Sequence, residues 1–329
     1  MKKILLIRFS SIGDIVLTTP VIRSLKTQLD AEIHTVTKKK YAFLYQNNPN
    51  VDKVFSFNKE EQEVIPDLLK EQYDFVVDLQ KNLRSFKIKK SLKAPSASFP
   101  KKNIQKWLMV NFKVNILPEN HVVDRYFEAL KHLNVSNDGK GLEYYIPNKD
   151  VINIADVYPE LASGYIGLVI GGQHFTKIVP PEKAAEIVKQ LELPVVLLGG
   201  KEDFERGEEI VTYAPKKTII NTCGKYNLNR SASLVQQCKV LITNDTGLMH
   251  IGTAFQKPIV SVWGNTIPGF GMYPYMPGHQ NRYYLAEVKG LSCRPCSKLG
   301  YKKCPKSHFN CMMNQDVDTI VNKVNAFIK

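Results

Sequence analysis

Residues 241–275 read LITNDTGLMHIGTAFQKPIVSVWGNTIPGFGMYPY. The β-branched run 240–243 predicts a buried strand, and it stops at the polar turn 244–247 before helix-compatible residues resume at Leu248. This order leaves the first amides of the helix without backbone partners, at the positive end of the helix dipole. The stretch therefore predicts an α/β unit with parallel strands and a place for an anion where this strand ends.

Working outward, both halves of the chain alternate apolar strand patterns with helical stretches, which predicts two parallel sheets covered on both faces. In the first half the strand patterns are 4–9, 32–37, 51–57 and 75–79, and in the second half they are 165–170, 194–198, 218–221, 240–243 and 258–262. A polar stretch at 134–163 is the linker candidate. A C-terminal helix carries one apolar stripe and is expected to pack, through Val317, Ile320, Val321, Val324 and Phe327.

The composition is that of a globular protein, with 43% hydrophobic and 23% charged residues. A formal net charge of +14 predicts acidic partners, either nucleotide phosphates, nucleic acid or an anionic membrane surface. No apolar run is long enough to span a bilayer. The opening MKKILLIRF is interrupted at Arg8, so it is interpreted as a first strand rather than a signal peptide, and the expected compartment is the cytoplasm.

Three common motifs are absent from the chain: the three-glycine dinucleotide fingerprint, the Walker phosphate loop and the Gly-x-Ser-x-Gly elbow. Their absence disfavours a dehydrogenase, a P-loop enzyme and a serine hydrolase. A basic nucleic-acid-binding protein remains an alternative from another class. No helix-turn-helix, finger or RNA-recognition motif supports that alternative.

Two separate stretches resemble one family. They are IRFSSIGD at 7–14 followed by TTP at 18–20, and NDTGLMH at 244–250 followed by Gly252, Lys257-Pro258 and Trp263-Gly264. Both resemble the bacterial ADP-heptose:lipopolysaccharide heptosyltransferases of glycosyltransferase family 9. The resemblance implies the GT-B fold of two facing Rossmann-like domains, with residues 1–155 binding the acceptor and residues 156–329 binding the nucleotide sugar.

The resemblance also implies an activity. The expected reaction is inverting transfer of heptose from ADP-L-glycero-β-D-manno-heptose to the lipopolysaccharide inner core, on Kdo-lipid A or heptosyl-Kdo-lipid A. A GT-B transferase that uses another nucleotide sugar on a cell-surface glycan remains an alternative. The family is metal-independent, so no cofactor is expected. The resemblance is weakest at 80–160, which leaves the acceptor open.

The candidate site residues follow from the same resemblance. Asp14 is expected to be the general base, with a helix-capping carboxylate as the alternative, and Lys177 is expected to neutralise the departing diphosphate, with an exposed loop lysine as the alternative. The expected donor-binding residues are Thr176, Lys177, Asp245, Thr246, Gly247, Leu248 and His250, the last of which has a core histidine as its alternative. The expected acceptor-binding residues are Ser10, Ser11, Gly13, Lys81 and Arg84.

Residues 81–113 hold ten basic residues, no acidic one, and interleaved aromatic and aliphatic side chains. This bias favours contact with an anionic amphiphile such as lipid A over a plain solvated surface. The expected partners are therefore ADP-heptose, a lipid A-linked core acceptor and the anionic inner face of the inner membrane, where the enzyme would be peripheral. No nucleic acid is expected.

The late cysteines Cys293, Cys296, Cys304 and Cys311, with His308 among them, have spacings compatible with a zinc knuckle. In a reducing cytoplasm, metal binding is a better interpretation than disulfides. Related transferases carry similar cysteines without being known as zinc enzymes. No metal is therefore the expectation, and structural zinc is the alternative.

Overall fold

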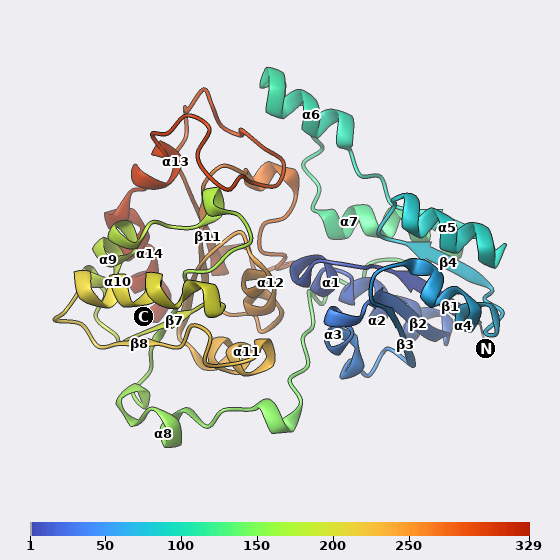
Figure 1. Ribbon diagram of the computed structural model, residues 1–329, viewed down its shortest axis with the longest axis horizontal. Helices are drawn as coiled ribbons and strands as arrows, with labels where there is room; N and C mark the ends of the chain where they lie inside the picture. The colour runs from blue at the N-terminus through green and yellow to red at the C-terminus, as the bar shows by residue number, and fades with distance from the viewer. Residues whose placement is uncertain (1) are drawn as a thin grey trace. The chain divides into compact units, whose positions relative to one another are not determined.

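The computed structural model describes residues 2–329, which form two compact units (Figure 1). The first unit comprises Met1–Lys102 and Asn120–Tyr145, and the second comprises Asn103–Glu119 and Ile146–Lys329. The boundary after Tyr145 lies upstream of the boundary expected at 155/156. The segment Asn103–Glu119, which the sequence assigns to the first domain, groups with the second unit.

The first unit is built on a parallel sheet with the strand order β3-β2-β1-β4-β5. Its strands are β1 (Lys3–Ile7), β2 (Glu32–Lys38), β3 (Lys53–Phe57), β4 (Phe75–Asp78) and β5 (Ser96–Ser98). The first four were expected from their apolar patterns. The Ser-Ala-Ser strand β5 carries no such pattern and is an edge strand.

The helices of the first unit are α1 (Ile12–Val16), α2 (Thr19–Leu29), α3 (Phe43–Gln46), α4 (Ile65–Leu69), α5 (Leu83–Leu92) and α7 (Val122–Phe127). The sequence predicts one helix from Ile15 to Leu29, whereas the structure has two. Pro20 lies in the first turn of α2, where its missing N–H is tolerated, but it cannot donate to the preceding turn. The chain therefore ends α1 before α2 begins.

The second unit has a six-stranded parallel sheet in the order β11-β10-β9-β6-β7-β8. Its strands are β6 (Ile166–Val169), β7 (Val195–Leu198), β8 (Ile219–Asn221), β9 (Val240–Asn244), β10 (Ile259–Trp263) and β11 (Tyr283–Glu287). Its helices are α6 (Asn103–Phe112), α8 (Ile154–Val157), α9 (Pro181–Gln190), α10 (Phe204–Tyr213), α11 (Leu228–Gln237), α12 (Gly247–Ala254), α13 (Asn310–Met313) and α14 (Val317–Ile328).

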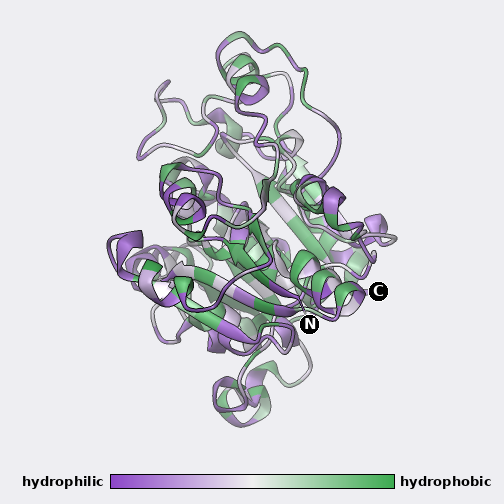
Figure 2. Ribbon diagram, turned by 90° about the vertical axis from the view of Figure 1, so that its right-hand side faces the viewer, coloured by the Kyte–Doolittle hydropathy of each residue, from purple (hydrophilic) through white to green (hydrophobic). Residues whose placement is uncertain are grey.

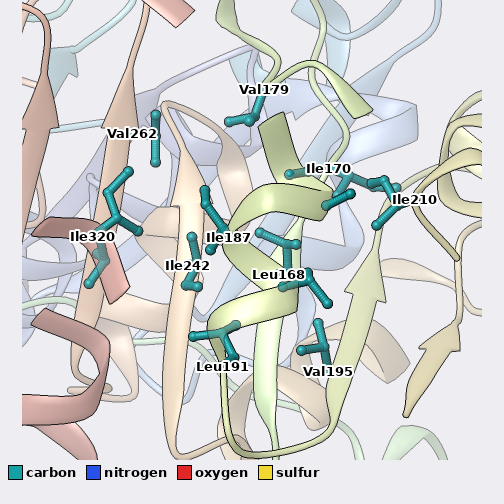
Figure 3. Close-up of a cluster of buried hydrophobic side chains, with 14 of the residues drawn as sticks. Leu168, Ile170, Val179, Ile187, Leu191, Val195, Ile210, Ile242, Val262 and Ile320 are labelled. Atoms are coloured by element: carbon teal, nitrogen blue, oxygen red, sulfur yellow. The ribbon is translucent and has the colours of Figure 1, made fainter. Parts of the chain in front are cut away.

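Alternate residues of these strands enter two apolar layers, one on each face of the second sheet. Leu168 and Ile242 pack with Ile187 of α9 and Ile320 of α14 (Figure 3). Their strand neighbours Val169 and Leu241 pack instead with Leu234 and Val235 of α11 on the opposite face. The expected packing stripe of the C-terminal helix is thus confirmed, and the hydropathy colours of Figure 2 show the apolar character of the strands.

Both sheets reverse their direction of strand addition at an interior position. In the first sheet the reversal lies between β1 and β4, and in the second it lies between β6 and β9. Ligands of open parallel sheets bind beyond the carboxyl ends of the strands at such a switch point. A ligand-binding site is therefore expected at the loops that follow β1, β4, β6 and β9.

Candidate active site

In the second unit, the loops after β6 and β9 are joined by an ion pair. The Lys177 ammonium lies 2.5 Å from the Asp245 carboxylate, and the side chains are only 16% and 11% exposed. The Thr266 hydroxyl, in the loop after β10, donates to the same carboxylate oxygen at 3.1 Å. Asp245 thus holds three neighbouring loops together at the switch point, and it supplies the negative charge that faces Lys177.

Asn244, the last residue of β9, positions the Lys177 loop. Its side-chain amide donates to the carbonyl oxygens of Gly171 at 3.1 Å and Lys177 at 2.9 Å, and the residue is fully buried. The sequence presents Asn244 only as a turn residue before Asp245. Asn244 reaches these carbonyl oxygens because β9 pairs with β6, which brings two loops that are distant in the sequence together.

The turn 245–248 ends in the N-terminus of α12, with Thr246 at the N-cap. Among residues 2–329, no side-chain hydrogen bond caps this end of α12, and the Thr246 hydroxyl lies 3.4 Å from that of Thr243. The amides from Gly247 onward are thus oriented at the end of the sheet, where a helix N-terminus favours an anion. His250 lies on the buried side of α12, 2% exposed.

Thr176 is buried and its hydroxyl is engaged within the second unit. This hydroxyl accepts from the Tyr301 amide at 2.8 Å, and the Thr176 amide donates to the Tyr301 carbonyl at 3.2 Å. The structure therefore places Thr176 next to Lys177 as a residue that anchors their loop.

In the first unit, Asp14 lies at the start of α1, beyond the end of β1. Its carboxylate accepts from the Ser11 amide at 3.1 Å and the Ser11 hydroxyl at 2.9 Å, which is a capping arrangement. The other oxygen lies 2.6 Å from the Arg8 guanidinium. With 24% of its side chain exposed, Asp14 is both a capping residue and an accessible carboxylate.

Arg8 is a buried cation that the sequence analysis did not assign to the site. It donates to the carbonyl oxygens of Leu79 at 2.5 Å and Ser10 at 2.9 Å. Burial on its own would lower the pKa of the Arg8 guanidinium, but Asp14 together with Tyr126 and Tyr45 outweighs this effect, and the pKa is raised. Arg8 therefore remains charged and fixes both the loop after β1 and the Asp14 side chain.

The remaining acceptor candidates lie near the same switch point in different settings. Ser10, Ser11 and Gly13 belong to the loop after β1 and the start of α1. Lys81 follows β4, and its amide donates to Asp78 at 2.7 Å. Arg84 lies on α5 within 3.6 Å of Glu61 and 3.7 Å of Glu60, so part of its charge is neutralised.

Lys101 is a further cation near Asp14 that the sequence analysis assigned only to the basic stretch. Burial lowers the pKa of the Lys101 ammonium, and the positive charge of Arg8 adds to this shift, whereas Asp78 and Asp14 oppose it. Lys101 thus lies within electrostatic reach of Arg8, Asp78 and Asp14. Only the folded sheet brings it there.

The basic stretch 81–113 divides between the two units. On α5, Lys87 pairs with Glu61 at 2.9 Å and Lys89 pairs with Asp78 at 3.0 Å, so this part of the charge is internally balanced. Helix α6 differs, because it has no buried residue and exposes Ile104, Trp107 and Phe112 by 72%, 50% and 62%. Within residues 2–329, no helix is both long and apolar enough to cross a bilayer.

An Asp-x-Asp sequence occurs at 316–318, and paired carboxylates of this kind are candidate ligands for a divalent metal. Here Asp316 is the N-cap of α14, where it accepts from the Thr319 amide at 3.0 Å and the Thr319 hydroxyl at 2.7 Å. This position is at the start of the terminal helix rather than in the loops after β6 and β9. Asp316 therefore caps the N-terminus of α14 and does not belong to the candidate site.

The chain has two Rossmann-like units, each with charged groups at its switch point. This is the architecture of the α/β GT-B class of glycosyltransferases. The sequence profile of glycosyltransferase family 9 (heptosyltransferase) matches residues 63–299. The chain belongs to this family. The expected resemblance, fold class and enzyme class are thus confirmed, and the nucleic-acid-binding alternative is set aside.

Individual relatives agree. Lipopolysaccharide heptosyltransferase 1 of Campylobacter coli is 25% identical over 291 residues, which is 80% of this chain and 84% of that relative. Lipooligosaccharide heptosyltransferase 2 of Haemophilus influenzae is 36% identical over 91 residues, 27% of this chain and 26% of the relative.

Solved structures share the fold. A glycosyl transferase family 9 protein from Veillonella parvula has a TM-score of 0.78 at 23% identity, covering 99% of this chain and 97% of its own. E. coli ADP-heptose lps heptosyltransferase II has a TM-score of 0.72 at 20% identity, covering 100% and 98%. E. coli heptosyltransferase WaaC, solved with ADP, has a TM-score of 0.68 at 18% identity, covering 99% and 99%.

Proposed function

We propose that this enzyme transfers heptose, with inversion, from ADP-L-glycero-β-D-manno-heptose to Kdo-lipid A or heptosyl-Kdo-lipid A. The observation that carries the proposal is the cluster formed by Lys177, Asp245 and the N-terminus of α12 at the switch point of the second sheet. One ammonium and a set of oriented amides suit the two phosphates of a nucleotide sugar. The names of the relatives support heptose as the sugar.

In the proposed reaction, Asp14 accepts the proton of the acceptor hydroxyl as that oxygen attacks the anomeric carbon. The bond from this carbon to the diphosphate breaks in the same displacement, which inverts the configuration. Lys177 and the amides of 246–248 neutralise the charge that grows on the departing ADP. Because these groups supply positive charge, we propose that no divalent metal is needed at the diphosphate.

Asp245 has a different role in this proposal, because a carboxylate would repel a diphosphate. It contacts the Lys177 ammonium and the Thr266 hydroxyl. A bound diphosphate would compete with Asp245 for the ammonium, and Asp245 could then receive a sugar hydroxyl. ADP affinity would therefore reflect an exchange of partners rather than the filling of an unpaired cation.

The proposed acceptor is anionic, which fits the surroundings of Asp14. Arg8 pairs with Asp14, Lys101 lies within electrostatic reach of it, and Lys81 follows the neighbouring strand β4. Such groups would attract the carboxylate of Kdo and the phosphates of lipid A. A heptosylated core carries the same acidic groups, so both acceptors fit this chemistry.

The donor proposal is tested directly by transfer assays. The enzyme is incubated with Kdo-lipid A or heptosyl-Kdo-lipid A and one of ADP-heptose, a UDP sugar or a GDP sugar, and the products are analysed by mass spectrometry. We expect a mass increase of one heptose with the ADP donor only. Transfer from a UDP or GDP sugar, with none from ADP-heptose, would remove the donor proposal.

We predict that ADP stabilises the protein thermally. A ligand at roughly 100 times its Kd adds about 2.7 kcal/mol to the free energy of unfolding when it binds only the folded state. Differential scanning fluorimetry with ADP, UDP and GDP at equal concentration should show a rising Tm with ADP and smaller shifts with the others. An equal shift with all three would mean that the pocket recognises phosphate but not adenine.

We also propose that the enzyme is peripheral at the cytoplasmic face of the inner membrane and that α6 makes the contact. Its exposed side chains Ile104, Trp107 and Phe112 are accompanied by Val114 and Ile116, which are 48% and 55% exposed. Trp107 and Phe112 pack edge to face at 5.3 Å. An apolar surface flanked by lysines is the composition of an interfacial segment.

Replacement of Ile104, Trp107 and Phe112 by serine should weaken binding to phosphatidylglycerol vesicles. Burying one such side chain contributes about 1.5–3 kcal/mol, so loss of all three is expected to lower vesicle affinity by more than about tenfold. Co-sedimentation measures this change. Phe204→Ser, at a 40% exposed phenylalanine on α10, is the matched control and should bind like the wild type. Equal binding by the triple variant would place the contact elsewhere.

A further inference from the structure

Four cysteines surround one cavity in the second unit. The cavity is lined by Cys293, Cys296, Cys304 and Cys311, together with His308 and Asn265. All four thiols are free, and Cys311 is buried. Burial raises the pKa of Cys296, and the thiols of Cys293 and Cys304 add to the shift.

His308 faces this cluster as a donor. Its Nδ1 atom accepts a hydrogen bond from the Asn310 amide at 3.0 Å, which assigns the ring proton of the neutral imidazole to Nε2. That nitrogen lies 4.0 Å from the sulfur of Cys293. His308 is therefore arranged to donate to a sulfur atom and not to act as a metal ligand itself.

Asn265 supplies an independent observation that points to a ligand in the cavity. It is 1% exposed, and neither its side-chain nitrogen nor its oxygen has a hydrogen-bond partner among the described residues. Buried amides in folded proteins are almost always hydrogen-bonded. Its N–H groups would find acceptors if the neighbouring sulfur atoms were thiolates.

We propose that Cys293, Cys296, Cys304 and Cys311 bind one thiophilic divalent cation, zinc or ferrous iron, in a tetrahedral site. The Cys-x-x-Cys pair gives the close ligand spacing of such sites, and Cys304 and Cys311 supply the second pair. Each thiol releases its proton to solvent as it binds. Asn265 and His308 then donate to the thiolates, as outer partners do in metal centres.

Metal binding requires a contraction of the cluster. Among residues 2–329, no three of these sulfur atoms lie within 4.8 Å of one another. Sulfur ligands about 2.3 Å from a shared ion lie closer together than this. The segment 293–311 consequently has to close by a small movement when the ion binds.

The cluster is attached to the loop after β6, which carries Lys177, and to the loop after β10, which carries Thr266. Tyr301 bonds to Thr176, and Phe309 stacks on Phe175 at 5.1 Å. Arg294 donates to the carbonyl oxygens of Gly264 at 2.7 Å and Thr266 at 2.9 Å. If Lys177 acts as in the proposed function, the ion would therefore fix the loop that carries it.

The test measures metal and not transfer, so its outcome is independent of the donor proposal. The full chain is purified without chelators and analysed by inductively coupled plasma mass spectrometry, and we expect one zinc or one iron per chain. Elemental analysis distinguishes the two metals. Cys296→Ser and Cys304→Ser should lose the ion, whereas Cys238→Ala, at a buried free cysteine outside the cluster, should retain it.

A second measurement uses the wild-type protein alone, in case the serine variants fail to fold. The metal is removed with a chelator under reducing conditions and Co²⁺ is added. We expect a sulfur-to-cobalt charge-transfer band that saturates at one ion per chain, and slower hydrogen exchange at the amides of Thr176 and Lys177. Absence of stoichiometric metal and of the cobalt band, a disulfide within the cluster, or full metal content in Cys304→Ser would overturn the site.

Discussion

Asp14→Asn is expected to lower turnover by about 10²–10⁴, which is the usual contribution of a positioned general base. The amide keeps one oxygen, which can still accept from the Ser11 amide and hydroxyl, so the cap should survive. Its NH2 group would replace the oxygen that faces Arg8, which keeps its hydrogen bonds to the carbonyl oxygens of Leu79 and Ser10. The amide cannot, however, take up the proton of the attacking hydroxyl group at neutral pH. ADP affinity should stay close to that of the wild type, because Asp14 belongs to the first unit and the donor cluster to the second. Steady-state transfer assays and ADP titration calorimetry measure the two quantities.

The substitution also removes the charged partner of a buried arginine, so a stability effect has to be separated from the chemistry. Asp138→Asn is the matched control, since Asp138 pairs with the buried Arg23 at 2.6 Å in the same unit. We expect Asp138→Asn to lower Tm about as much as Asp14→Asn does, because both remove the charged partner of a buried arginine. Turnover of Asp138→Asn should stay at the wild-type level. Near-normal turnover in Asp14→Asn would exclude Asp14 as the base.

Lys177→Ala should weaken both donor binding and catalysis. A hydrogen bond to a charged group contributes about 1.5–3 kcal/mol, which corresponds to roughly a tenfold to hundredfold loss of ADP affinity. Removal of one group that stabilises a developing negative charge lowers kcat by about 10²–10³. Asp245 would then lack its ammonium, and its negative charge would further oppose the diphosphate. Calorimetry gives the ADP affinity, and transfer assays give kcat.

Lys183→Ala provides the comparison, because Lys183 also pairs with a carboxylate in the second unit, that of Glu186 on α9. It should bind ADP and transfer heptose like the wild type. If Lys177→Ala loses kcat but binds ADP normally, Lys177 acts only as the leaving-group charge develops. If both quantities are unchanged, the diphosphate lies elsewhere.

The sequence alone predicts the parts of this fold that carry strong periodic patterns. The buried strands β1, β6, β9 and β10 are runs of branched apolar residues, and each was expected within one or two positions. The edge strands β5 and β11 were missed because they are short or partly exposed, and their pairing depends on the neighbouring strand.

The candidate site could be predicted only where a local motif marks it. Asp14 and the turn 245–248 lie in motifs that also encode a turn and a helix start. Arg8, Lys101 and Asn244 owe their positions to contacts between strands or loops far apart in the chain. No spacing in the sequence reports such contacts, so residues of this kind are found only in the folded protein.

The division of the chain into two units has a practical consequence for dissecting the enzyme. The polypeptide passes from one unit to the other after Lys102, after Glu119 and after Tyr145. A fragment that starts at residue 156 would lack α6 and would also lose Ile152, a buried residue of its own core. Three chain segments therefore connect the two units, and cutting the chain at one position does not separate them.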